Sequence, residues 1–172
     1  MRSMNASTWV PVVTPEPRRA EPSKQCARSS GQGTPVILVD TGPLVALFDV
    51  LDDAHHRCRE ALHEIREPLV STVPVLTEAF HLLNPASRGS QALQEFVARG
   101  GLGMWFLDDP ALARTFELMR RYPDHPMDLA DASLVAAAEA LRVTAVFTVD
   151  RRDFATYRAR VGRSWRRFET LP

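Results

Sequence analysis

The feature that most constrains the fold of this chain is a regular alternation of short apolar runs and longer segments with helical periodicity. The run at 36–39 is continuous and rich in β-branched residues, which predicts a strand that is buried on both faces. We also expect strands at 69–72, 104–107 and 145–148, and a last strand at 165–168. Strands that alternate with helices form a parallel sheet covered on both sides. The prediction is therefore an α/β fold of three layers, α/β/α, around a central parallel sheet of four or five strands.

Helical segments occupy the gaps between these runs, and proline and glycine mark their ends. Pro74 and Pro110 lie in first turns, where the missing amide hydrogen removes no helical hydrogen bond. Gly100 and Gly101 end another helix. The expected helices cover 44–48, Asp52 or Asp53 to about Arg66, 75–83, 90–99, 108–121 and 128–141.

Residues 1–34 differ in composition from the rest of the chain. They contain four prolines and a stretch of Ser, Gly and Gln at 29–33, with no helical or strand periodicity. Five basic and two acidic residues give them a charge of +3, which leaves −3 for the other 138 residues. We expect 1–34 to be a disordered extension, or the product of a start codon assigned too far upstream, and 35–172 to be the folded domain.

Length and composition exclude several classes of protein. At 172 residues and 45% hydrophobic, the chain is long enough to bury a core without disulfides or a structural metal. No apolar run approaches the roughly 20 residues of a membrane-spanning helix. Lys and Arg (21) balance Asp and Glu (21), so no overall basic field marks a nucleic-acid binder. The two cysteines form no disulfide framework and fit a reducing, cytoplasmic compartment.

Acidic residues follow the predicted strands at the positions where an α/β sheet forms its sites. Asp40 ends the first strand and Asp150 follows the fourth, at the carboxyl edge of a parallel sheet. Asp128 and Asp131 are three residues apart at the start of a helix, so they can share a face. Glu78 lies in an otherwise apolar helix, where an acid needs a partner or a cation. Converging carboxylates repel each other, and Mg²⁺ or Mn²⁺ relieves that repulsion. The chemistry this implies is phosphodiester hydrolysis.

Each of these acids also has a purely structural interpretation. Asp128 and Asp131 can cap a helix or interact with its dipole, and Asp150 can be a turn residue. Glu78 can be a half-exposed residue at a helix end. Asp40 is the hardest to explain in this way, because a buried strand delivers it to the edge of the sheet. The joint placement of the acids, rather than any one of them, favours a site.

Four blocks of sequence carry a resemblance to a known family. They are VILVDTGPLVALFD at 36–49, TVPVLTEA at 72–79, MDLADASLVAAAE at 127–139 and FTVDRRDF at 147–154. In this order they resemble the signature blocks of PIN domains, and the resemblance covers about 35–172. The small single-domain form is similar to VapC-type toxins of bacterial toxin–antitoxin pairs. Such domains begin close to their first strand, so residues 1–34 depart from the family pattern.

The resemblance implies a metal-dependent ribonuclease, the toxin of a type II toxin–antitoxin pair. Its implied cofactor is Mg²⁺ or Mn²⁺, and its implied partners are an RNA substrate, a cognate antitoxin and a second copy in a homodimer. The family's acidic quartet matches Asp40, Glu78, Asp131 and Asp150. The further candidates are Asp128 and Asp153, for a second metal or its water shell, and Thr41 and Thr148, which match hydroxyl residues that hydrogen-bond near the metal.

Other interpretations of these residues remain open. Asp40-Thr41-Gly42 after an apolar strand matches the aspartic-protease triplet, although that fold is rich in β-structure. The side chains of His55, His56, Cys58 and His63 match no standard zinc spacing and suit a solvated helix face, with Cys58 in the core. The arginine-rich run at 157–168, together with Arg151 and Arg152, can bind RNA phosphates or form a charged surface. The alternative function is a PIN-like module that binds RNA or protein without cutting.

Overall fold

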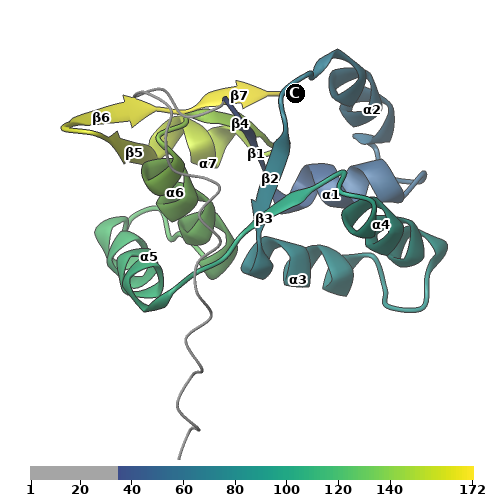
Figure 1. Ribbon diagram of the computed structural model, residues 1–172, viewed down its shortest axis with the longest axis horizontal. Coiled ribbons are helices and arrows are strands. Elements are labelled where there is room, and N and C mark those ends of the chain that lie inside the picture. The colour runs from purple at the N-terminus through teal and green to yellow at the C-terminus, as the bar shows by residue number, and fades with distance from the viewer. Residues whose placement is uncertain (1–34) are drawn as a thin grey trace, which may run out of the picture. The chain divides into compact units, whose positions relative to one another are not determined.

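The computed structural model describes residues 35–172, so the expectations for 1–34 lie outside the described residues. The described chain alternates strands and helices in the predicted order (Figure 1). None of its helices is both long and apolar enough to cross a membrane.

Five parallel strands form the central sheet, in the order β3-β2-β1-β4-β7. Their bounds are β1 Ile37–Val39, β2 Leu69–Thr72, β3 Gly103–Trp105, β4 Ala145–Phe147 and β7 Glu169–Leu171. The strand β1 is central, and its three residues are buried because helices cover both of its faces. The predicted parallel α/β sheet is confirmed, with the first four strands within two residues of their expected bounds.

The prediction of the last strand needs a correction. The segment at 165–168 belongs largely to β6 (Ser164–Arg167), which pairs antiparallel with β5 (Arg158–Val161) in a separate two-stranded sheet. Gly162, with φ of +65°, makes the turn between them, a conformation that glycine adopts without strain. The fifth strand of the main sheet is β7 instead. All four residues of β6 are exposed, so this strand has no buried face to join the core.

The helices form two layers around the sheet. Figure 1 shows α5 and α6 on one side and α1, α2 and α4 on the other. The bounds are α1 Thr41–Phe48, α2 His55–Glu64, α3 Val73–Leu82, α4 Arg88–Ala98, α5 Asp109–Arg121, α6 Leu129–Leu141 and α7 Arg151–Thr156. The short α7 was not predicted. The helix α3 follows β2 directly and contacts both α1 and α6, so it lies where the two layers meet beyond the carboxyl ends of the strands.

The helix α6 is the most buried helix of the domain. Residues 132–138 are all buried, and five of these seven are Ala or Ser. Small side chains let the helix approach α5, α3 and the β5–β6 hairpin closely, since packing density is maintained only when backbones come together. The hydroxyls of Ser133 and Thr72 lie 2.5 Å apart and join α6 to the end of β2. Because α6 is packed tightly against these neighbours, the acids of its first turn are held in place.

Candidate active site

The carboxylate of Asp40 lies at the carboxyl end of the central strand and is only 7% exposed. It caps α1, because its Oδ1 accepts the backbone N–H of Thr41 at 2.7 Å. Its Oδ2 accepts the hydroxyl of Thr148, which follows β4, also at 2.7 Å. Two neighbouring strands therefore hold this side chain in one orientation.

The carboxylate of Glu78 approaches from α3. Its Oε2 accepts the hydroxyl of Thr41 at 2.7 Å. Thr41 thus joins the two acids, since its N–H donates to Asp40 and its Oγ1 donates to Glu78. The hydroxyls of Thr41 and Thr148 therefore each donate a hydrogen bond to a carboxylate of the site predicted from the sequence.

The acids of α6 lie in its first turn. Asp128 is the N-cap, because its Oδ1 accepts the backbone N–H of Asp131 at 2.8 Å. The half-buried carboxylate of Asp131 accepts, at Oδ2, the hydroxyl of Tyr157 at 3.2 Å. Asp128 is therefore structurally explained as a cap, whereas Asp131 is held by a residue from the other end of the domain.

Asp150 and Asp153 lie at the start of α7, the short helix that follows β4, with Asp150 as its N-cap. The side chain of Asp150 is exposed and caps α7, with Oδ1 accepting the N–H groups of Arg152 and Asp153 at 3.1 and 3.2 Å. The backbone N–H of Asp150 donates to Thr148 Oγ1 at 3.0 Å. Asp153 Oδ1 lies 2.6 Å from His125 Nε2. Asp150 is thus linked to Asp40 through Thr148, with its own carboxylate turned toward α7.

Burial and mutual repulsion raise the pKa of two of these carboxyl groups. Removal from water is the main cause at Asp40, where the nearby charges of Glu78 and Asp128 add to it and the pKa rises to about 6. The pKa of Asp131 rises to about 7, again mainly through burial, with further contributions from Asp128 and Asp40. The hydrogen bonds from Thr148 and Tyr157 act in the opposite direction. The site therefore concentrates negative charge that the protein compensates only in part.

The donor set of this cluster fits a hard divalent cation. All six candidate acids offer oxygen ligands, which Mg²⁺ and Mn²⁺ prefer. The ion pairs found in residues 35–172 use Glu95, Glu117, Glu139 and Asp153, so no arginine, lysine or histidine pairs with Asp40, Glu78 or Asp131 there. Within that same range, no three His, Cys, Asp or Glu side chains are close enough to hold an ion between them. Asp40, Glu78, Asp128 and Asp131 therefore lie close enough for their charges to interact, without forming a closed ligand shell.

Two residues at this site escaped the sequence analysis. Tyr157 was considered only as the start of an arginine-rich run, yet its hydroxyl reaches Asp131 and its ring is fully buried. His125 contacts Asp153 and packs edge-on against Tyr157, with ring centroids 5.7 Å apart. No local pattern signals either contact, because each joins segments more than 25 residues apart that only the fold brings together.

Two open cavities border the acids and share no residue. One, of about 610 Å³, is largely apolar and includes Val73, Pro74 and Leu129 beside Glu78 and Asp128. The other, of about 460 Å³, is lined by Val149 and Asp150 together with Arg57, Arg151 and Arg152. We call the second cavity the arginine pocket.

The structure also shows where the residues of the other interpretations lie. The parallel α/β sheet is incompatible with the β-rich aspartic-protease fold. His55 is buried with Nδ1 2.6 Å from the carbonyl oxygen of Ala46, and Cys58 is a buried core residue. Neither belongs to a metal-binding cluster within the described part of the chain. In the arginine-rich run, Arg158 donates to the carbonyls of residues 155–157 and so supports the end of α7.

Comparison with known proteins places the chain in a family. The model of the PIN domain matches residues 37–159, and the chain belongs to the PIN domain family. Ribonuclease VapC26 of Mycobacterium tuberculosis is 29% identical over 126 residues, which cover 71% of this chain and 92% of that protein.

Solved structures share the fold at lower identity. VapC20 of Mycobacterium tuberculosis, described as a toxin that cleaves the sarcin–ricin loop, matches with a TM-score of 0.63 and 18% identity, over 68% of this chain and 92% of its own. A toxin–antitoxin complex from Klebsiella pneumoniae matches with a TM-score of 0.54 and 18% identity, over 70% of this chain and 91% of its own. VapBC2 of Rickettsia felis, bound to a DNA fragment from its promoter, matches with a TM-score of 0.54 and 14% identity, over 80% of this chain and 99% of its own.

Proposed function

We propose that this protein is a metal-dependent endoribonuclease and the toxin of a toxin–antitoxin pair. The observation that carries the proposal is the group of buried and half-buried carboxylates of Asp40, Glu78 and Asp131 at the carboxyl edge of the sheet, which form no ion pair with a basic side chain in the described residues. The family membership and the ribonuclease name of the VapC26 relative support RNA as the substrate class.

In this proposal Asp40, Glu78, Asp131 and Asp150 hold Mg²⁺ or Mn²⁺, with Asp128 and Asp153 in secondary positions. A divalent cation at such a site activates water and stabilises charge on the oxygens of the phosphodiester. Thr41 and Thr148 orient Glu78 and Asp40 through their hydroxyls. Tyr157 does the same for Asp131 and favours its ionised, ligating form. No side chain is needed as a covalent nucleophile.

The proposed protein partners are a cognate antitoxin and a second copy of the chain. The likeness to a toxin–antitoxin complex and to VapBC2 supports the antitoxin. Large apolar side chains also stand exposed on the described surface, among them Leu51, Leu82, Phe106 and Phe116. Exposed apolar groups of this size are typical of surfaces that a partner covers.

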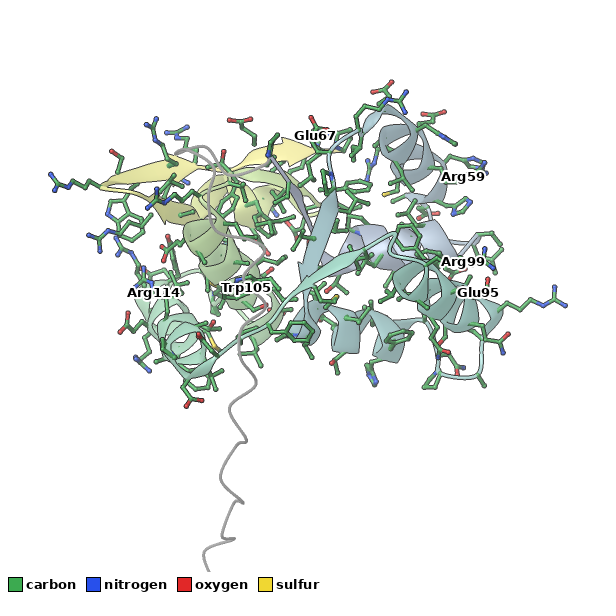
Figure 2. All side chains as sticks on the ribbon, in the orientation of Figure 1. Arg59, Glu67, Glu95, Arg99, Trp105 and Arg114 are labelled. Carbon is green, nitrogen blue, oxygen red and sulfur yellow. The ribbon has the colours of Figure 1, made fainter. Side chains whose placement is uncertain are left out.

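The test is cleavage of labelled total RNA by the full chain, with Mn²⁺ and with EDTA, beside Asp40→Asn. Cleavage that needs the metal and is lost in the variant supports the proposal. Folded protein that binds RNA but does not cut it, in Mg²⁺ or in Mn²⁺, would instead support the non-catalytic module. Glu95→Gln is the matched control, because Glu95 is an exposed acid on α4 in an ion pair with Arg99 (Figure 2).

A further inference from the structure

The arginine pocket lies beside the proposed catalytic acids but is built from different elements. Arg57 comes from the first turns of α2, whereas Arg151 and Arg152 begin α7. Asp150 lines the same cavity, so the pocket and the acid site share a wall. The sequence separation of more than 90 residues between Arg57 and Arg151 shows that the fold, and no local motif, brings these three cations together.

The three guanidinium groups are available for an external anion. The ion pairs of residues 35–172 involve Arg99, Arg114 and His125 as their basic members, so no arginine of the pocket is in a salt bridge there. All three residues are exposed. Three like charges around one cavity repel each other, and an anion with several oxygens removes that repulsion through charge-assisted hydrogen bonds.

The geometry points to a phosphate-binding subsite: we propose that Arg57, Arg151 and Arg152 bind a phosphodiester of the RNA next to the one being cut. This inference rests on the proposed ribonuclease function and adds a substrate contact to it. An RNA strand laid along the acids needs its neighbouring phosphates neutralised, because the acids repel them. The apolar cavity near Glu78 is lined by no arginine or lysine and has His81 as its one basic side chain, so the arginine pocket is the side on which the backbone is held.

The test measures binding apart from cleavage. Fluorescence anisotropy of a labelled single-stranded oligouridine is recorded in EDTA over a range of KCl concentrations, with the full chain, Arg57→Gln and Arg152→Gln. Arg59→Gln is the matched control, since Arg59 lies on the same helix with its side chain pointing away from the domain (Figure 2). Losing one phosphate contact on a single strand reduces the slope of log K against log [salt] by about 0.7, which is roughly eightfold weaker binding at 50 mM salt.

The subsite is supported if Arg57→Gln and Arg152→Gln show that loss of slope and affinity while Arg59→Gln matches the wild type. It is overturned if Arg57→Gln and Arg59→Gln behave alike. RNA cleavage in Mn²⁺ is measured on the same proteins, so that failure of the subsite can be told apart from failure of the ribonuclease proposal. If the enzyme cuts RNA but Arg57→Gln and Arg59→Gln bind the oligonucleotide equally well, only the subsite is refuted. Wild-type protein that does not bind the oligonucleotide at all overturns the subsite as well. Thermal melting of each variant excludes unfolding as the cause.

Discussion

At the scale of single residues, Asp40 shows which features of the site can be predicted from the sequence and which cannot. Its place after an apolar, β-branched run predicted a buried strand ending in an acid at the sheet edge, and the structure shows that position. The two hydrogen bonds that orient it come from Thr41 and Thr148, one adjacent in sequence and one 108 positions away. Contacts of the second kind, including that of Tyr157 with Asp131, depend on the packing of distant elements and leave no local pattern.

The raised pKa values of Asp40 and Asp131 make the stability of the metal-free protein depend on pH. The pKa of each carboxyl group is higher in the folded state than in the unfolded state, where it is near 3.8. Such a group adds its full contribution to the free energy of unfolding at pH values below the unfolded-state pKa, and that contribution is lost as the pH rises through the folded-state pKa. In EDTA the melting temperature is therefore expected to fall between pH 5 and pH 8, by several degrees for a change of about 1–3 kcal/mol.

Differential scanning calorimetry checks this pH dependence. The variant Asp40→Asn removes one of the two groups and is expected to flatten the decline, whereas Glu95→Gln leaves it unchanged. A melting temperature that rises from pH 5 to pH 8 in metal-free protein would contradict the electrostatic account of the site.

Tyr157 gives a second test at this scale. The variant Tyr157→Phe keeps the buried ring and removes only the hydroxyl that donates to Asp131. Because that bond lowers the pKa of Asp131, its loss favours the protonated carboxyl and should weaken Mn²⁺ binding at pH 7 by about threefold to tenfold, the effect of about 1 kcal/mol. The midpoint of Mn²⁺-dependent thermal stabilisation measures this change. Equal midpoints for Tyr157→Phe and wild type would exclude a positioning role for the hydroxyl.

At the scale of elements, the longer helices and the first four strands were more predictable than the end of the chain. Proline and helical periodicity placed α3 and α5 within about two residues. The strand β7 is as short as β1 and β4 but reads Glu-Thr-Leu, so it lacks their continuous apolar run. The helix α7 has six residues, a length at which periodicity carries little information. The arginine-rich segment of β6 was correctly predicted to be a strand. Its sheet was not predicted correctly, because the pairing partner of a strand depends on the whole topology.

The junction of α1 with the loop after β4 offers a prediction about packing. A Cβ on Gly42 would lie 2.2 Å from Val149 Cγ2, far inside contact distance. Gly42→Ala is therefore expected to destabilise the domain by about 1–3 kcal/mol despite the better helix propensity of alanine. It should also reduce RNA cleavage, because Val149 adjoins Asp150.

Urea unfolding of Gly42→Ala, Val149→Ala and the double variant forms the matching double-mutant cycle. The double variant should recover most of the stability lost in Gly42→Ala, since the smaller side chain at position 149 makes room for the new methyl group. Additive effects of the two changes would show that this contact does not position the loop.

At the scale of the whole molecule, the predicted architecture and the family agree with the structure, whereas the assembly of the site goes beyond what a sequence shows. The parallel sheet brings the ends of β1 and β4 together, and α3 and α6 add their acids from the flanking layers. The sequence predicts that these acids converge, because acids after parallel strands share one edge of the sheet. Which oxygen of each acid accepts a hydrogen bond follows only from three-dimensional packing.

The most direct test of the central claim follows Mn²⁺ binding and RNA cleavage in the same samples. Mn²⁺ is titrated into metal-free wild type, Asp40→Asn and Glu95→Gln, with calorimetry for binding and labelled total RNA for cleavage. We predict that wild type and Glu95→Gln bind Mn²⁺ and gain cleavage over the same concentration range, while Asp40→Asn loses both. Cleavage that persists in EDTA, or in folded Asp40→Asn protein, would contradict the account.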